Sequence, residues 1–209
     1  MHSVTAQPEV ARLGRIAGGL YLLFAVIFVL GSGIVSGANP NSNTFRIGIG
    51  FELLGDVLGL VTALGLYALL RRVDQVVALT MVAIAGMGSA AFYAVHVVQY
   101  STHSASLPGA DEASSMFSGL WLVPLGYLVL KSRYFPKIVG IALLVAAALW
   151  LAQFALYFFG PFLHVNGALF SLGGIGELFF VAWLLIFSAR PPVADGGLTA
   201  SPSPLHESK

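Results

Sequence analysis

Three carboxylic acids and one histidine lie inside long apolar stretches of this sequence, where an ionised side chain is costly. Glu52 and Asp56 are four residues apart, whereas His96 and Glu177 come from two later apolar stretches. An ionised carboxylate at the centre of a membrane helix costs about 2.5 to 3.5 kcal/mol. Three such groups cannot all stay charged without partners, so we expect them to hold protons, a cation or a basic ligand.

Glu52 and Asp56 lie one turn apart on the same face of their predicted helix. Small and polar residues at steps of three and four continue this face: Gly48, Gly55, Gly59 and Thr62. At this spacing the two carboxyl groups interact, and we expect them to titrate as a coupled pair. Two interpretations stay open. The pair is either a functional site or a hydrogen-bonded packing motif, and in the simplest structural alternative Arg46 bends inward to neutralise Glu52.

Polar positions in three other apolar stretches extend the candidate site. One stripe with helical spacing comprises Gly86, Ser89, Tyr93, His96 and Tyr100. At a rise of about 1.5 Å per residue, His96 lies roughly 5 Å below the outer end of its helix and Asp56 roughly 15 to 18 Å. All the polar groups fall in the outer half or at the middle. We therefore predict an outward-facing acidic cavity whose ligand-binding residues are Glu52, Asp56, Tyr93, His96, Gln153 and Glu177.

Three functional hypotheses fit these residues. In the first, a transporter subunit or sensor binds a small or lipidic ligand, a cation or a proton in the cavity. In the second, a membrane-embedded enzyme uses Asp56 or Glu177 as a catalytic acid, and His96 or Glu52 as a base, on an isoprenoid-like substrate. In the third, the chain is a structural partner of another membrane protein. Glu52, Asp56, His96 and Glu177 also offer nitrogen and oxygen ligands for a transition metal; no cofactor is predicted.

The composition is that of a membrane protein. Hydrophobic residues make up 57% of the 209 residues and charged residues only 9%, whereas a soluble domain carries about 25% charged residues. The lipid bilayer is thus the expected partner. The net charge of +1 and the lack of a basic run give no reason to propose a nucleic-acid partner. The absence of cysteine excludes disulfides and thiolate metal sites, and the oligomeric state stays open.

Six apolar runs predict an all-α, polytopic membrane protein built as a bundle of six transmembrane helices. The runs cover residues 16–36, 46–70, 75–100, 112–130, 137–159 and 165–188. Residues 12–189 form the transmembrane domain, 1–11 a flexible N-terminus and 190–209 a disordered tail rich in Pro, Gly and Ser. A cleaved signal peptide is an alternative for the first run, although that run exceeds the usual apolar length of about 7 to 15 residues.

The distribution of basic residues predicts the orientation. With both termini in the cytoplasm, nine of the ten Lys and Arg residues fall on the inner side and only Arg46 lies outside. Short cytoplasmic loops of membrane proteins collect Lys and Arg. We therefore expect a multi-pass protein of the bacterial cytoplasmic (inner) membrane with its N-terminus and C-terminus inside.

Four segments resemble a bacterial integral-membrane family catalogued as a domain of unknown function, number four-three-eight-six. They read RIAGGLYLLFAV, FRIGIGFELLGDV, PLGYLVLKSRYFPKIVGIALL and IGELFFVAWLLI. The most specific part is the basic hairpin that ends in the turn Ser132 to Pro136. The resemblance covers most of residues 12–188 and implies the six-helix architecture and a bacterial origin. It implies no reaction, cofactor or ligand.

Overall fold

The structure is a computed structural model that describes residues 6–160 and 171–188, and this part of the chain is all-helical. The helices are α1 (Ala6–Gly37), α2 (Asn43–Leu70), α3 (Gln75–Thr102), α4 (Ala110–Ser132), α5 (Lys137–Phe159) and α6 (Ser171–Ile186). Five of them are long and apolar enough to cross a membrane, and α6 contributes the shorter apolar helix Leu172–Ile186. The all-helical prediction is confirmed. The start predicted for the sixth span and the predicted disordered tail lie outside the described residues.

The ends of α2 to α5 lie within three residues of the predicted ends, whereas α1 begins at Ala6, ten residues before its predicted start. About half of the segment 1–11, predicted to be flexible, is therefore helical. Pro8 lies in the first turn, where a missing N–H is tolerated, and Glu9 in the same turn interacts favourably with the helix dipole. α2 begins three residues before the predicted start, because the Ser42 hydroxyl caps it by accepting a hydrogen bond from the Phe45 amide at 3.1 Å.

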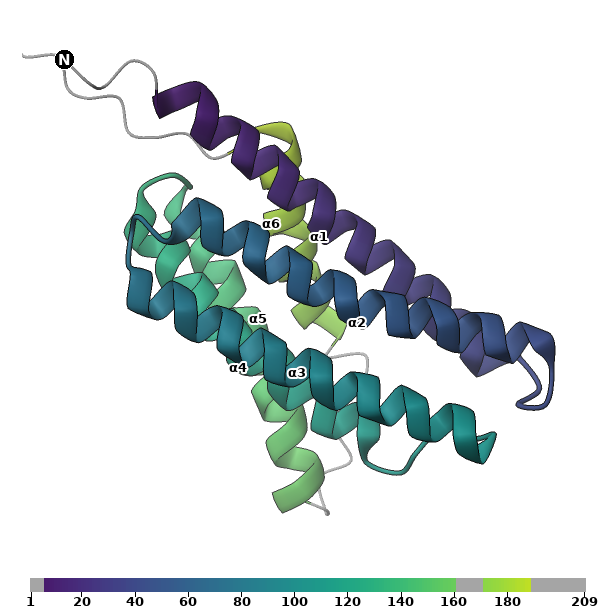
Figure 1. Cartoon of the computed structure of the whole chain (residues 1–209). Helices are drawn as coiled ribbons and strands as arrows, with labels where there is room; N and C mark the ends of the chain where they lie inside the picture. Colours follow the sequence, from purple (N-terminus) through teal and green to yellow (C-terminus); the bar gives the residue numbers. More distant parts are fainter. Residues whose placement is uncertain (1–5, 161–170, 189–209) are drawn as a thin grey trace, which may run out of the picture.

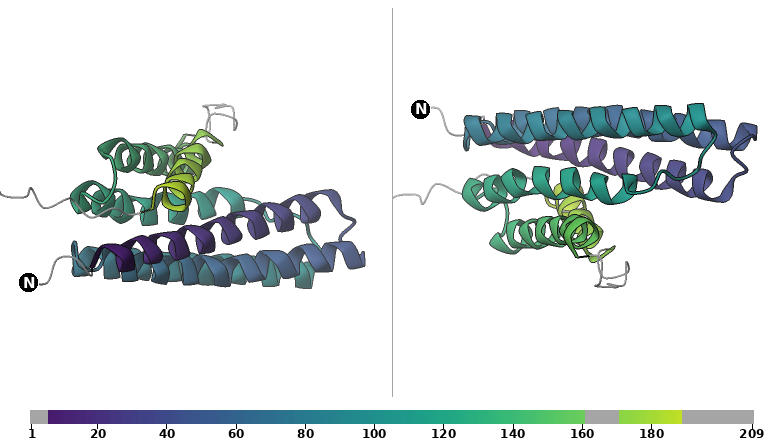
Figure 2. Two further views of the ribbon diagram at one scale, coloured as in Figure 1. Left: turned by 90° about the horizontal axis from the view of Figure 1, so that it is seen from above. Right: turned by 90° about the horizontal axis from the view of Figure 1, so that it is seen from below.

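The six helices form a closed ring in chain order (Figure 1). Each helix packs against the next one in the sequence, and α6 returns to α1, while α2 also touches α4. Figure 2 shows α1, α2 and α3 on one side of the molecule and α4, α5 and α6 on the other. The largest fully buried side chains of the core come from both halves and include Tyr21, Leu66, Leu122 and Phe180.

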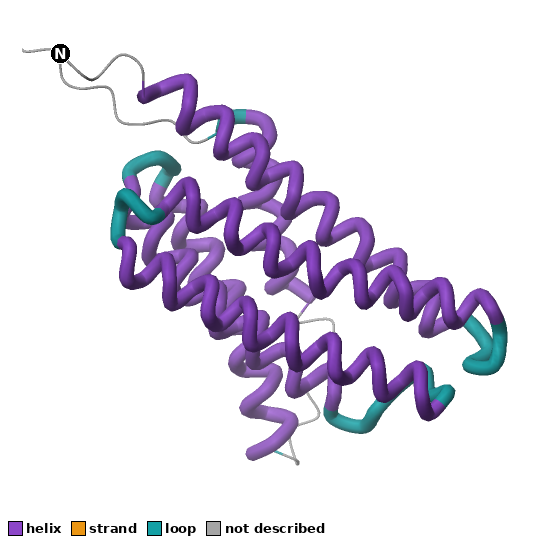
Figure 3. Tube along the Cα trace, in the orientation of Figure 1, coloured by secondary structure: helices purple, strands orange, loops and turns teal. Residues whose placement is uncertain are grey.

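The connections gather at the two ends of the bundle (Figure 3). The α1–α2 turn and the α3–α4 connection lie at one end, and the α2–α3 and α4–α5 turns lie at the other. This arrangement is that of helices that run alternately in opposite directions. The α1–α2 turn also extends beyond the end of α3. The helix ends are therefore staggered, and this stagger decides which polar groups meet.

Candidate functional site

His96 on α3 lies between the two acidic residues of α2. Its Nδ1 is 2.9 Å from Asp56 Oδ2, within hydrogen-bond distance, and its Nε2 is 3.6 Å from Glu52 Oε2. All three side chains are buried inside the bundle. We call these three residues the Glu52–His96–Asp56 group. Three of the sequence-predicted site residues are thus brought together by one helix pair.

Local structure explains why the two carboxyl groups reach one imidazole. Glu52 and Asp56 are separated by one helical turn, so both side chains leave α2 on the face that packs against α3. Gly31 of α1 lies directly behind Glu52: a Cβ atom there would come within 2.9 Å of the Glu52 backbone nitrogen. The missing side chain lets α1 approach and close the group from the other side.

A small cavity opens beside this group, at the end of the bundle that holds the α1–α2 turn. Its volume is about 80 Å³, enough for a few water molecules or a small ion. Four helices and the α3–α4 connection line it, through Phe28, Ser32, Val35, Ser36, Glu52, Phe92, Val95, His96, Gln99, Ala105, Ala110 and Ser114. Glu52 and His96 form part of the wall, whereas Asp56 lies behind them.

Gln99, one of the lining residues, has an unused hydrogen-bond acceptor. Its side chain is 7% exposed, and its Nε2 donates to the Ala105 carbonyl at 3.3 Å. Its Oε1 is buried and has no hydrogen-bond partner in the structure. Since the amide nitrogen is engaged by a carbonyl, the remaining atom must be the acceptor. The wall of the cavity therefore includes a residue with an unused, buried acceptor.

The depths estimated from the sequence were wrong for His96 relative to Asp56. The estimate placed the two residues about 10 Å apart along the membrane normal, yet they share a hydrogen bond. The count assumed that α2 and α3 end at the same level. In the structure the start of α2 projects past the end of α3 (Figure 1), and with this stagger Asp56 and His96 lie within hydrogen-bond distance.

Arg46 does not neutralise Glu52. Its side chain is exposed, and none of the ion pairs within residues 6–160 and 171–188 includes it. The basic group beside Glu52 is the imidazole of His96. An exposed guanidinium at the start of α2 keeps its hydration, which explains why it does not turn inward.

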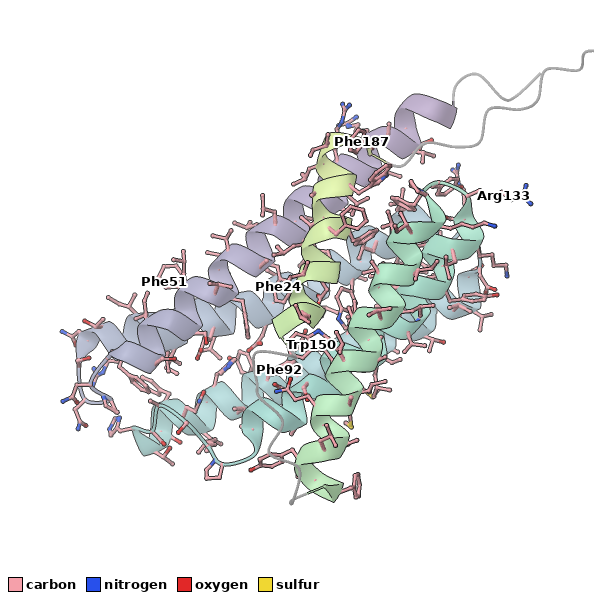
Figure 4. All side chains as sticks on the ribbon, turned by 180° about the vertical axis from the view of Figure 1, so that it is seen from behind. Phe24, Phe51, Phe92, Arg133, Trp150 and Phe187 are labelled. Carbon is pink, nitrogen blue, oxygen red and sulfur yellow. The ribbon has the colours of Figure 1, made fainter. Side chains whose placement is uncertain are left out.

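Glu177 belongs to a separate cluster on the other side of the bundle. The Tyr21 hydroxyl donates to its Oε2, and Trp150 Nε1 donates to its Oε1 at 3.0 Å. Figure 4 shows Trp150 between α5 and the start of α6. Gly173 makes room for the indole, because a Cβ there would lie 2.9 Å from Trp150 Nε1. α6 touches only α1 and α5 among the described helices, so Glu177 does not join the Glu52–His96–Asp56 group.

Two further candidate residues also lie away from the cavity. Tyr93 is 47% exposed on the outside of α3. Gln153 is on α5, which packs against α4 and α6, and its buried Oε1 has no hydrogen-bond partner. The structure thus brings together three of the six predicted ligand-binding residues and leaves Tyr93, Gln153 and Glu177 elsewhere.

The predicted metal set does not assemble. No group of three or more His, Asp or Glu side chains is arranged to hold a metal ion within residues 6–160 and 171–188. Glu52 and Asp56 each contact His96, and Glu177 lies on a different helix pair. What this arrangement offers chemically is a buried acid–base group next to a small polar cavity.

Comparison with known proteins identifies the family but not the activity. A family model described as "Domain of unknown function (DUF4386)" matches residues 16–187. The chain belongs to this family. The DUF4386 chain is also 28% identical over 137 residues to an uncharacterized protein of Archaeoglobus fulgidus, covering 62% of this chain and 76% of the relative. No solved structure matches it. The resemblance seen in the four segments is confirmed, and the function of this DUF4386 protein has to be argued from geometry.

Sequence reasoning missed Tyr21 and Gln99. The polar stripe was continued four residues beyond His96 to Tyr100, which is 45% exposed, whereas the cavity uses Gln99, three residues beyond. That signal was present in the helical spacing. Tyr21 gave none, because a tyrosine in an apolar run is usually a packing residue. Trp150 gave no signal either, although its indole also donates to Glu177.

Proposed function

We propose that this protein is a multi-pass protein of the bacterial cytoplasmic membrane that binds a proton or a small cation at the Glu52–His96–Asp56 group. In this role it acts as a transporter subunit or a sensor. The proposal rests on one observation: a buried imidazole lies 2.9 Å from one carboxylate and 3.6 Å from another, beside a small polar cavity.

The charge balance of the group favours a positively charged occupant. Two carboxylates and a protonated imidazole leave a net charge of −1, and a neutral imidazole leaves −2. An unbalanced charge inside a membrane helix bundle is costly. One proton or one monovalent cation brings the first state to neutrality. Gln99, which lines the same cavity, has a buried Oε1 without a hydrogen-bond partner; a small turn of this side chain would offer a further acceptor to a cation.

The size of the cavity beside the Glu52–His96–Asp56 group distinguishes the ion-binding hypothesis from the enzyme hypothesis. Pockets for drug-sized ligands measure about 300 to 1,000 Å³, whereas this cavity measures about 80 Å³. An isoprenoid-like substrate does not fit such a space, so the geometry supports the enzyme hypothesis less well. A sodium, potassium, ammonium or methylammonium ion does fit.

The binding proposal is tested by thermal unfolding of the purified full chain in detergent. Na⁺, K⁺, NH₄⁺ and methylammonium are added separately, with tetrabutylammonium as a cation too large for the cavity. A ligand at 100 times its dissociation constant should raise the unfolding midpoint by about 5 to 10 °C. The shift should vanish in Glu52→Gln and persist in the control Glu9→Gln, whose carboxylate is exposed on α1.

A proton as occupant gives a different result in the same assay. In that case no cation shifts the midpoint, but the stability of the native chain and of Glu52→Gln diverges between pH 5 and pH 8. If neither cations nor pH separates the two proteins, the binding proposal is overturned. The structural-partner hypothesis would then be the stronger one.

The orientation is tested with single cysteines, since the native chain contains none. Asn41→Cys lies in the α1–α2 turn and Gln75→Cys lies at the opposite end, at the start of α3. With both termini inside, a membrane-impermeant maleimide added to intact cells should label Asn41→Cys only. Gln75→Cys should react once the membrane is permeabilised. The reverse pattern would place the cavity on the cytoplasmic side.

A further inference from the structure

A basic pocket lies at the α4–α5 turn, at the end of the bundle opposite the Glu52–His96–Asp56 group. Its volume is about 650 Å³, and it is lined by Leu130, Lys131, Arg133, Phe135, Pro136 and Lys137. Three of these six residues are cationic. The function proposed above makes no use of this pocket, and the two surfaces share no residue.

The turn that carries the basic pocket is held in place by the core. Phe135 is 6% exposed, and its ring packs edge-on against Phe180 with the centroids 5.6 Å apart. The Ser132 hydroxyl accepts a hydrogen bond from the Tyr134 amide at 3.2 Å. Arg133 precedes this anchor and Lys137 follows it. Their backbone positions are therefore fixed in advance, which lowers the entropic cost of binding a ligand.

The pocket has more positive charge than its neighbours compensate. Lys131 Nζ lies 2.8 Å from Asp74 Oδ2 and 3.0 Å from the Tyr127 hydroxyl, so one cation is paired. Arg133 and Lys137 are exposed, and neither has a carboxylate within 4.0 Å among the described residues. Two cationic groups on either side of one anchored turn thus remain available for an anion.

An apolar surface runs away from the pocket along α5. Ile138 follows Lys137 directly, and Ile141 and Val145 come three and four residues further on; the three side chains are 63%, 53% and 54% exposed. This spacing places the three side chains on one helix face. Since α4 and α5 are both long and apolar enough to cross a membrane, their shared turn lies at the level of the lipid headgroups.

We propose that the basic pocket binds the phosphate headgroup of an anionic phospholipid, with an acyl chain lying along Ile138, Ile141 and Val145. Arg133 and Lys137 contact the phosphate, and Leu130 contacts the glycerol end of the chain. The apolar stripe favours a lipid over free phosphate, which has no apolar part. Basic pockets between membrane helices are suited to such headgroups.

The test measures lipid binding to the purified full chain by native mass spectrometry. The probes are dioleoyl phosphatidylglycerol, dioleoyl phosphatidylcholine and inorganic phosphate. Arg133→Gln/Lys137→Gln removes the two unpaired cations of the pocket. The matched control, Arg71→Gln/Arg72→Gln, removes two exposed cations at the same end of the bundle but outside the pocket. Arg133→Lys/Lys137→Arg keeps the charge and shows whether the turn tolerates substitution.

The native chain should bind phosphatidylglycerol at least tenfold more tightly than phosphatidylcholine. Each basic group near an anionic headgroup contributes about a factor of five, so the pocket variant should lose about 20-fold in affinity for phosphatidylglycerol. The control pair should lose less than threefold, and the charge-keeping pair should bind normally. Equal losses in both neutralised pairs, or equal binding of the two lipids, would overturn the proposal. So would displacement of the lipid by inorganic phosphate at comparable concentration, which would indicate a phosphate site.

Discussion

His96 Nδ1 and Asp56 Oδ2 lie 2.9 Å apart although the two residues are 40 positions apart in the chain. Glu52 Oε2 approaches the other ring nitrogen at 3.6 Å. One imidazole therefore links two carboxyl groups of the neighbouring helix. The nearer carboxylate determines which ring nitrogen carries the hydrogen. This contact ties α2 to α3, and Glu52 and His96 form part of the cavity wall.

The unequal distances predict unequal effects of the two carboxylates on stability. Asp56→Asn should lower the free energy of unfolding by about 1 to 3 kcal/mol, because it weakens a buried hydrogen bond to a group that is charged when protonated. Glu52→Gln should have a smaller effect, since 3.6 Å exceeds normal hydrogen-bond distance. Unfolding of the detergent-solubilised protein measures both, with Glu9→Gln as the exposed control. A larger loss in Glu52→Gln than in Asp56→Asn would contradict the distances.

Much of the helical framework could be predicted because hydrophobic runs and turn residues are local signals. The spacing of Glu52 and Asp56 fixed their common face for the same reason. The meeting of His96 with both was only partly predictable, because it depends on the rotation and stagger of two helices. The polar stripes of the two helices indicate which faces turn inward, but they do not show how far one helix is displaced along the other.

The neighbours of Glu177 could not be predicted from the sequence. Its helical position was correctly placed inside an apolar stretch, but its neighbours are decided by the ring order, in which α6 touches α1 and α5 rather than α2 and α3. Its partners Tyr21 and Trp150 are 156 and 27 positions away. Such long-range contacts follow from the packing of whole helices. A single sequence gives no direct information on that packing.

Gly31→Ala should destabilise the bundle, whereas Gly33→Ala should not. A Cβ at Gly31 would lie 2.9 Å from both the backbone nitrogen and the Cγ of Glu52, so α1 and α2 would have to separate. At Gly33 nothing lies within 4 Å, and alanine gains helix propensity of about 0.5 to 1 kcal/mol. Thermal unfolding compares the two variants. Equal stability would contradict close packing of α1 on Glu52.

The Tyr21–Glu177–Trp150 contacts predict non-additive effects in a double-mutant cycle. Tyr21→Phe and Trp150→Phe each remove one donor from a carboxylate that has a donor on each oxygen. Each should cost about 1 to 3 kcal/mol of unfolding free energy, and the double variant should deviate from the sum by at least about 0.5 kcal/mol. Tyr93→Phe is the control, because this tyrosine is exposed. Strict additivity would show that Glu177 does not couple the two donors.

We expect the stability of the fold to depend on pH through Asp74, which lies outside the membrane-spanning segments. The hydrogen bond from Lys131 and, after it, that from the Val77 amide lower the pKa of Asp74 below its ordinary value. A carboxyl group whose pKa is lower in the folded protein stabilises the fold above the unfolded pKa, about 3.9. This contribution is lost as the pH falls through the folded pKa.

Asp74→Asn separates the ion pair from the helix cap, because asparagine still caps α3 but carries no charge. At pH 7 its unfolding midpoint should lie on the order of 1 to 2 °C below that of the native chain, since the pair with Lys131 is exposed. This gap should close as the pH is lowered below the folded pKa, where native Asp74 is also neutral. Asp74→Ala should lie lower still, because it also removes the cap. A gap between Asp74→Asn and the native chain that is unchanged from pH 7 to pH 2 would show that Lys131 does not stabilise the ionised carboxylate.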